Sequence, residues 1–293
     1  MAGGKPARRC WFCGERHTAA DDPPEHIIPA ALGAELTTDA VAHSCNERAG
    51  QEVDQPLVND LFVAFNRVFF DIRDRRGRQP PNPVRNAAFK DGTPVNLETR
   101  NGPWEAKVIP QVREEGDGFV ITAGSVEEAE EIIAKKSERT GHQFRVVDER
   151  RSDDEHLEVV FTLSLDTRLR VRARAKMVLG ALSKVFPEAW LDSPEAQQLQ
   201  EWLWDPRPKL DGAEIGAMHN AVDGVLSLMC QPPEHLVALM PMGVDRLMVL
   251  VILFGKEAMP YEVQLPDGIA APETCWVMDP QEEGAGVALY GVD

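Results

Sequence analysis

The sequence contains few cysteines and no long apolar run. Its 293 residues include five cysteines, too few for a disulfide framework in a chain of this length, which favours a reducing compartment. The longest apolar run, residues 247–254, is far shorter than the ~20 residues that a membrane-spanning helix needs. No apolar signal segment follows the first residues. We therefore expect a soluble, cytoplasmic protein that does not bind a membrane.

The sequence also lacks an excess of positive charge. Its formal net charge is −17, which argues against a chain whose whole surface binds nucleic acid. The acidity is unevenly spread, because residues 1–90 carry 12 basic and 12 acidic side chains whereas residues 91–293 carry 19 basic and 36 acidic ones. No Walker loop, GxSxG elbow or internal repeat is present.

Arginines gather in the neutral part of the chain, mainly between residues 67 and 90. The planar guanidinium group matches phosphate oxygens, so we expect this segment to hold the backbone of a nucleic acid. A solvated linker is the alternative. The arginines predicted to bind nucleic acid are Arg48, Arg73, Arg75, Arg76 and Arg78.

Three short motifs follow one another within the first fifty residues. Residues 10–14 read CWFCG, a layout typical of a zinc knuckle whose tight turn points two thiolates at one metal. Residues 25–29 read EHIIP: a short apolar strand that begins with a carboxylate and an imidazole and ends at a proline. Residues 45–50 read CNERAG, a polar segment that can start a helix. This order predicts a compact metal-binding module.

Together these motifs resemble one branch of the HNH endonuclease family, whose signature reads CxxC, EHIIPxxLG and CNxxxG. The resemblance covers roughly the first sixty residues. It implies a ββα-metal fold, in which a two-stranded hairpin and a helix hold one catalytic metal with a structural zinc beside it. For the whole chain we expect an α+β fold: this zinc-knuckle module, then a larger α+β domain with an antiparallel sheet.

The residue types suit phosphodiester hydrolysis, which requires an activated water and a counter-charge for the developing oxyanion. The resemblance implies that His26 is the general base, and an imidazole pKa of ~6.5 allows this near neutral pH. It also implies that Glu25 and Asn46 bind the catalytic ion, and oxygen donors suit Mg²⁺ or Mn²⁺. The alternatives are a structural histidine at position 26 and a helix-capping residue at position 46.

The chain departs from the family pattern at two places. The family usually completes its zinc site with a second CxxC, but the position three before Cys45 is Ala42. Zinc is therefore expected on three cysteines and a fourth ligand, for which His43 is the nearest candidate and His17 a poorer one. Gly50 stands where some relatives place a second histidine ligand, which predicts a sparse metal site and a slow enzyme. The predicted cysteine ligands are Cys10, Cys13 and Cys45.

Prolines between residues 80 and 83 cannot continue a helix and predict a domain boundary. Residues 1–80 would form the HNH module with a packing helix, and residues 81–293 an acidic α+β domain. In a long buried helix at 168–186, we interpret the basic residues, Lys176 among them, as the solvent-facing side. The other predicted elements are strands at 95–98, 104–109, 119–122, 144–147, 157–165, 235–240, 246–254 and 261–265, and helices at 125–139 and 195–204.

The sequence thus predicts a metal-dependent HNH endonuclease, a hydrolase that cuts phosphodiester bonds of DNA rather than RNA. The resemblance implies a role in defence or in a mobile element. One alternative is a zinc-knuckle binding module without catalytic activity, whose acidic domain binds a protein partner. The other is a nuclease that the acidic domain keeps inactive until an effector arrives, because negative charge repels nucleic acid over about a Debye length, ~8–10 Å.

Overall fold

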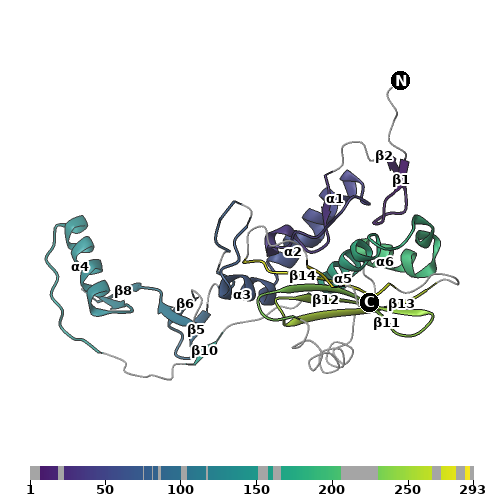
Figure 1. Ribbon diagram of the computed structural model, residues 1–293. Coiled ribbons are helices and arrows are strands. Elements are labelled where there is room, and N and C mark those ends of the chain that lie inside the picture. The colour runs from purple at the N-terminus through teal and green to yellow at the C-terminus, as the bar shows by residue number, and fades with distance from the viewer. Residues whose placement is uncertain are drawn as a thin grey trace. The chain divides into compact units, whose positions relative to one another are not determined.

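Figure 1 shows the computed structural model of the chain, which has a mixed α+β fold with antiparallel sheets, as predicted. It divides into two compact units, Met1–Pro80 with Leu165–Asp293, and Pro81–Ser164. No helix in the described part of the chain is long and apolar enough to cross a membrane. The structure describes residues 7–18, 23–74, 76–80, 82–84, 87–99, 104–116, 118–150, 158–160, 166–205, 230–265, 272–281 and 288–290.

The N-terminal module, residues 7–80, begins with two short hairpins. Strands β1 (Ala7–Arg9) and β2 (Arg16–Thr18) pair around the cysteine turn, and β3 (Glu25–His26) pairs antiparallel with β4 (Thr37–Thr38). Helix α1 follows, so β3, β4 and α1 confirm the expected ββα order. The module's helical elements are η1 (Ala30–Leu32), α1 (His43–Ala49), the π-helical turn η2 (Gly50–Asp54), α2 (Gln55–Val58) and α3 (Leu61–Phe69).

The rest of the first unit consists of helices packed on one antiparallel sheet. Helix α5 (Thr167–Leu182) lies against β12 and β13 and also contacts η2, α2 and β4 of the N-terminal module. Because α5 has neighbours on several sides, its residues 173–182 are all buried. The other elements are η3 (Glu188–Asp192), α6 (Pro194–Trp204), β11 (His235–Pro241), β12 (Arg246–Leu253), β13 (Glu257–Gln264), β14 (Thr274–Met278) and β15 (Ala288–Tyr290), with strand order β13-β12-β11-β14-β15.

One hydrophobic core joins the N-terminal module to residues 166–278. Trp11 of the knuckle stacks on Trp190 of η3 with ring centroids 5.5 Å apart, and both indoles are buried. This arrangement differs from the predicted division into 1–80 and 81–293, since residues 165–293 group with residues 1–80. The physical reason is that a module of this size buries too little apolar surface by itself, and the later helices supply the rest.

The second unit, Pro81–Ser164, is smaller. Ser125 caps α4 (Val126–Thr140) by accepting from the Glu128 backbone N–H at 3.2 Å, which confirms the first half of the predicted capping box. The Glu128 carboxylate accepts from the Gly124 N–H at 2.9 Å, one residue before the N-cap. The predicted strand at 144–147 is not formed, and most of the one at 157–165 lies outside the described residues. The strands and the helix of the second unit are β5 (Ala87–Phe89), β6 (Pro94–Glu98), β7 (Glu105–Val108), β8 (Gln111–Glu115), β9 (Gly118–Thr122), α4 (Val126–Thr140) and β10 (Val159–Val160).

His235, the first residue of β11, ties the sheet to the N-terminal module. Its Nδ1 accepts a hydrogen bond from the Phe254 backbone N–H at 3.1 Å, so Nε2 carries the proton and donates to the Leu32 carbonyl oxygen at 2.8 Å. Burial lowers the pKa of His235 to about 4, against the weaker opposite effects of Leu32 and Asp279. The histidine is therefore neutral in the folded protein at physiological pH.

Acid is expected to destabilise the first unit through His235. Because the folded-state pKa lies below the ordinary ~6.5, the unfolded chain binds the proton more tightly, so stability rises with pH between about 4 and 6.5 and is level above. At 1.36 kcal/mol per unit of pKa shift, this histidine contributes about 3 kcal/mol across that range. Urea unfolding of wild type and of His235→Gln at several pH values measures this contribution. The other groups titrate in both proteins, so their effects cancel in the difference. Equal pH dependence in both would contradict a buried neutral histidine.

Candidate zinc centre and active site

The knuckle brings three thiols together. The Sγ atoms of Cys10, Cys13 and Cys45 lie within 4.8 Å of one another. The turn between the first two is closed by the Gly14 N–H, which donates to the Cys10 carbonyl oxygen at 2.8 Å, and Gly14 takes a left-handed φ of 79° that favours glycine. Tetrahedral zinc, with Zn–S bonds of about 2.3 Å, holds its sulfurs about 3.8 Å apart. The cluster therefore fits a structural zinc ion.

Electrostatics also favour a cation at this cluster. A hydrogen bond from Cys45 lowers the pKa of Cys10 to about 5. The pKa of Cys13 is raised, mainly by burial, and that of Cys45 is raised, mainly by its hydrogen bond to Cys10. Three sulfurs this close cannot all be thiolates unless a positive ion compensates their charge, and a divalent metal does so by direct coordination.

The structure does not bring the predicted fourth ligand to this cluster. The His43 Nε2 lies 3.6 Å from Glu47 Oε1, and the imidazole is 54% exposed. His17 lies opposite Arg8 in the β1–β2 pair. Among the described residues, the metal-binding group contains neither histidine and consists of the three cysteines alone.

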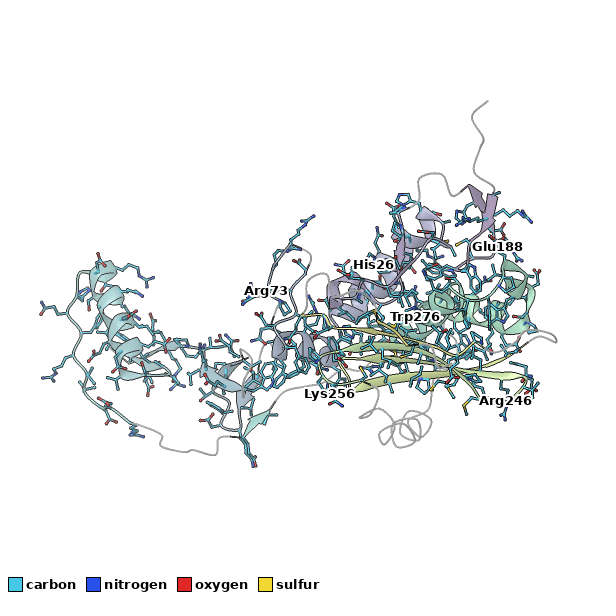
Figure 2. All side chains as sticks on the ribbon, viewed as in Figure 1. His26, Arg73, Glu188, Arg246, Lys256 and Trp276 are labelled. Atoms are coloured by element: carbon cyan, nitrogen blue, oxygen red, sulfur yellow. The ribbon has the colours of Figure 1, made fainter. Side chains whose placement is uncertain are left out.

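The two predicted active-site residues of β3 face opposite sides of the strand. Successive side chains of a strand alternate between its faces, and here Glu25 is buried whereas His26 is half-buried. Figure 2 shows His26 on the N-terminal module, above the sheet of the first unit. The backbone at this point is fixed by pairing of His26 with Thr37 and by the Ile27 N–H, which donates to the Leu36 carbonyl oxygen at 2.9 Å.

Glu25 binds Lys176 of α5, which lies 151 positions further along the chain. The Lys176 Nζ is 2.6 Å from Glu25 Oε1, 2.7 and 2.8 Å from the two carboxylate oxygens of Asp54, and 2.8 Å from the His26 carbonyl oxygen. Lys176 is 0% exposed. The interpretation of this lysine as part of the solvent-facing side of its helix is therefore wrong, because α5 is enclosed by other elements.

Burial governs the ionisation of this triad. It raises the pKa of Glu25 and of Asp54, and Lys176 partly offsets both increases. For Lys176, burial opposes the charged form, but the two carboxylates outweigh it and raise its pKa. The ammonium is therefore charged and is the cation that both carboxylates bind.

Asn46 lies in the second turn of α1 and is half-buried. Its Nδ2 donates to the Pro23 carbonyl oxygen at 3.2 Å. The N-cap position of α1 is Ala42, with no side-chain cap, so the alternative of Asn46 as the capping residue is wrong. The amide oxygen is the atom of this side chain that suits a hard cation.

The residues present do not fit a divalent ion shared by Glu25 and Asn46. A dication at the Glu25 carboxylate would lie beside the Lys176 ammonium, and like charges at such distances repel strongly in a buried site. Among the described histidines, cysteines and carboxylates, the three cysteines are the one group of three or more with metal-ligand spacing.

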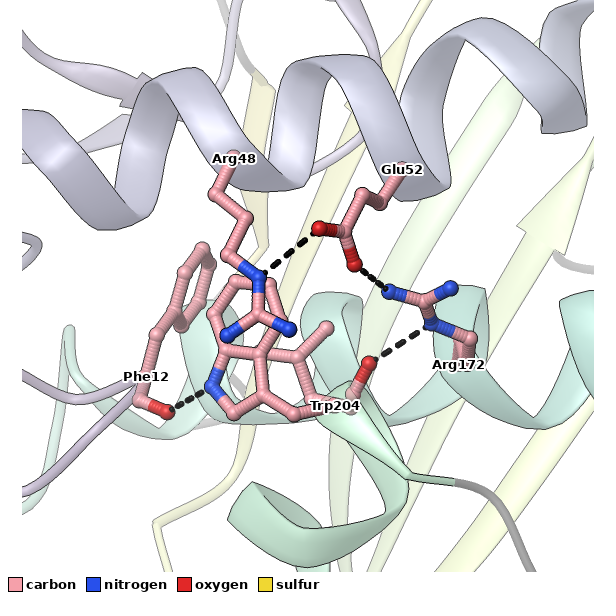
Figure 3. Close-up of polar contacts among 6 residues, drawn as sticks. Phe12, Arg48, Glu52, Arg172 and Trp204 are labelled. Atoms are coloured by element: carbon pink, nitrogen blue, oxygen red, sulfur yellow. Dashed lines mark hydrogen bonds and ion pairs between the residues drawn. The ribbon is translucent and has the colours of Figure 1, made fainter.

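Arg48, predicted to bind nucleic acid, takes part in a network that joins the module to the later helices (Figure 3). Its Nε donates to Glu52 Oε1 at 2.9 Å, and its guanidinium lies 4.2 Å from the ring centre of Trp204. The other Glu52 oxygen accepts from Arg172 Nη2 at 2.6 Å, and Trp204 Nε1 donates to the Phe12 carbonyl oxygen at 2.7 Å. Arg48 is half-exposed, so one side of it stays open to a ligand.

The remaining predicted arginines lie in the loop that follows α3. Figure 2 shows Arg73 projecting from this loop. Arg73 and Arg78 each pair with an aspartate of the same loop, two and four residues earlier, at 2.9 and 2.6 Å. Arg76 is exposed, and Arg75 lies outside the described residues. Paired surface arginines keep part of their positive potential, because such pairs are weak.

The fold and the site define a zinc-knuckle module of the ββα type. Residues 10–62 match the model of the family described as HNH endonuclease, in agreement with the resemblance seen in the sequence. This part of the chain is an HNH endonuclease domain. No match is found among curated proteins or among solved structures.

Sequence reasoning missed two residues of this site, Asp54 and Lys176. Basic residues at 168, 170, 172, 174 and 176 are spaced by two, and successive members are therefore about 200° apart around a helix. Such a series cannot occupy one solvent-facing side. That spacing, within an otherwise apolar helix, was the available signal that Lys176 points inward.

Proposed function

We propose that this chain is a metal-dependent nuclease that hydrolyses phosphodiester bonds of DNA, with His26 as the general base. The HNH family match of residues 10–62 supports the nuclease class. The residue assignment depends on one observation: His26 is half-buried on β3 while Glu25, on the other side of the strand, is enclosed. Of the two side chains, the imidazole is therefore the one that a nucleic acid can reach.

The chemistry assigned to this chain is proton transfer by His26. A neutral imidazole accepts a proton from the attacking water, whose oxygen bonds to phosphorus as the bond from phosphorus to the leaving oxygen breaks. Metal dependence belongs to the proposal because HNH nucleases are metal-dependent, and Mg²⁺ or Mn²⁺ is the ion expected. No step is assigned to Glu25, whose carboxylate binds Lys176.

Nucleic acid is the substrate that the domain implies, and we propose DNA. The exposed arginines at 73, 76 and 78, together with the half-exposed Arg48, are the proposed phosphate contacts. Zinc-bound thiolates persist in a reducing compartment, which agrees with the proposed cytoplasmic location. A role in defence or in a mobile element is proposed from the family alone.

Plasmid nicking tests the function. Wild-type protein is expected to nick supercoiled DNA in the presence of Mg²⁺ or Mn²⁺ and to stop when EDTA is added. His26→Ala is expected to be slower by about 10²–10⁴-fold, the usual contribution of a general base. His142→Ala, which removes an exposed histidine of the second unit, is the matched control and should retain full activity. A labelled RNA of the same sequence measures the preference for DNA.

A zinc-knuckle binding module without catalytic activity is the second candidate. It is favoured by the observation that Lys176 contacts the Glu25 carboxylate, which the resemblance in sequence implies is a metal ligand. In this case wild type and His26→Ala would be equally inactive in nicking, and both would still bind DNA or a protein partner. Nicking that survives in His26→Ala at the wild-type rate would contradict the assignment of the base.

A further inference from the structure

Lys176 is surrounded by oxygen atoms as a bound metal ion would be. Its ammonium lies 2.6–2.8 Å from the Glu25 carboxylate, the Asp54 carboxylate and the His26 carbonyl oxygen. These groups come from β3 and from the π-helical turn η2, and the lysine itself comes from α5. Three elements that are distant in sequence therefore meet at one buried positive charge.

Lys176 combines two hydrogen bonds with two ion-pair contacts: its Nζ donates to the His26 carbonyl oxygen and to Asp54 Oδ2, and it lies 2.6 Å from Glu25 Oε1 and 2.7 Å from Asp54 Oδ1. An ammonium group has three N–H donors and no acceptor, and three oxygen-bearing groups surround it. A charged lysine has no lone pair with which to act as a base or a nucleophile. Its ammonium, 2.6 and 2.7 Å from a carboxylate oxygen of Glu25 and of Asp54, already supplies the positive charge between these two groups.

The contacts fix both residues of β3 at once. The strand contains only Glu25 and His26, and Lys176 binds the first through its side chain and the second through its backbone oxygen. The direction of the His26 side chain follows from the backbone that the lysine holds. Lys176 does not itself reach the imidazole through any of these contacts.

We propose that Lys176 is a positioning residue for His26, and that its ammonium, rather than a divalent ion, is the cation that Glu25 binds. The first part rests on the proposed function, since it requires His26 to be the base. The catalytic ion would then be held without Glu25. The second part concerns metal affinity and is independent of activity.

The test uses the full chain and separates stability from catalysis. A neutral triad, Lys176→Met with Glu25→Gln and Asp54→Asn, removes the buried charges together and so avoids an unpaired one. We expect its unfolding midpoint to stay near that of wild type, while kcat for DNA nicking falls at least 10-fold and KM changes less than about 3-fold, because misplacement of a catalytic group acts on kcat. Lys184→Met, an exposed lysine just beyond α5, is the matched control.

Mn²⁺ binding, followed by electron paramagnetic resonance, tests the second part without any turnover. Glu25→Gln is expected to leave Mn²⁺ affinity within about 3-fold of wild type, whereas loss of a ligand typically costs more than 10-fold. A larger loss in Glu25→Gln, or a neutral triad with wild-type kcat, would overturn the inference. Should the triad not fold, Lys176→Arg keeps the charge but replaces the compact ammonium with a larger planar guanidinium that cannot occupy the same place among these oxygens. We expect kcat to fall in this variant too, and an unchanged kcat would be equally decisive against the inference. Inactive wild type, by contrast, would refute the proposed function.

Discussion

Cys45→Ser is expected to release the metal of the knuckle and to destabilise the whole first unit. Its sulfur is the one that α1 brings to the cluster, and the other two come from the turn between β1 and β2. Structural zinc supplies about 10–16 kcal/mol of folding energy in small zinc-finger peptides. This is as large as the total stability of an ordinary domain, about 5–15 kcal/mol, so even a fraction of it is decisive here.

The loss should spread beyond the knuckle because its residues belong to the common core. Trp11 and Phe12 are buried, and their carbonyl oxygens accept hydrogen bonds from Gln200 and Trp204 of α6. Without the metal, the three sulfurs no longer hold this turn against α1. We therefore expect less than a tenth of the zinc content of wild type, and an unfolding midpoint well below that of wild type.

Elemental analysis and urea unfolding of the purified variant measure these two effects. Cys275→Ser is the matched control, since this half-buried thiol lies in β14 outside the cluster. His43→Ala is the second control and should keep its zinc, because the imidazole is exposed beside Glu47. Retention of one zinc per chain by Cys45→Ser would refute the assignment, and loss of zinc from His43→Ala would restore that histidine as the fourth ligand.

The parts of this site that follow from local sequence could be predicted. The cysteine turn needs only Cys10, Cys13 and a glycine that accepts a left-handed conformation. The ββα order was implied by the resemblance of the motifs between residues 10 and 50 to the HNH family. The capping box of α4 and the hairpin of β11 and β12 are equally local. In each case the residues that determine the local structure lie close to one another in the sequence.

The parts that depend on contacts across the chain could not be predicted in the same way. Glu25 has the sequence context of a metal ligand, and only its packing against α5 shows that it binds Lys176. Arg48 has the exposure and charge of a phosphate contact, yet it also lies over Trp204, 156 positions away in the sequence. A pattern in one segment does not show which charged partner from another segment will be buried against it.

The division into units failed for a related reason. Composition changes near residue 80, and the acidic character of residues 91–293 suggested one continuous domain. In the structure, residues 81–164 form a unit of their own between two segments that share a core. Apolar periodicity predicts that a helix such as α5 is buried, but it does not say against which segment.

This shared core leads to the last prediction: a chain that ends at residue 80 should not fold. It would lack the stacking of Trp190 on Trp11, the Lys176 contacts with Glu25, and the His235 hydrogen bond to Leu32. Each loss removes the partner of an aromatic, charged or carbonyl group. At roughly 3–5, 3–5 and 1–3 kcal/mol, the three losses together are comparable with the 5–15 kcal/mol that stabilises a typical domain. We expect no cooperative unfolding transition by circular dichroism and no dispersed amide spectrum by NMR.

The matched variant removes only residues 81–164 and joins the flanking segments with a flexible glycine-serine linker. Because none of the described residues of the second unit belongs to the shared core, this variant should keep a cooperative transition and its zinc. A chain of residues 1–80 that folds and binds zinc would refute the shared core.

The same deletion variant tests whether the second unit regulates the nuclease. If the second unit keeps the nuclease inactive, the variant nicks DNA faster than wild type at low salt, and added salt reduces the difference because the repulsion is screened. An equal or lower nicking rate of the variant would leave no regulatory role for the second unit.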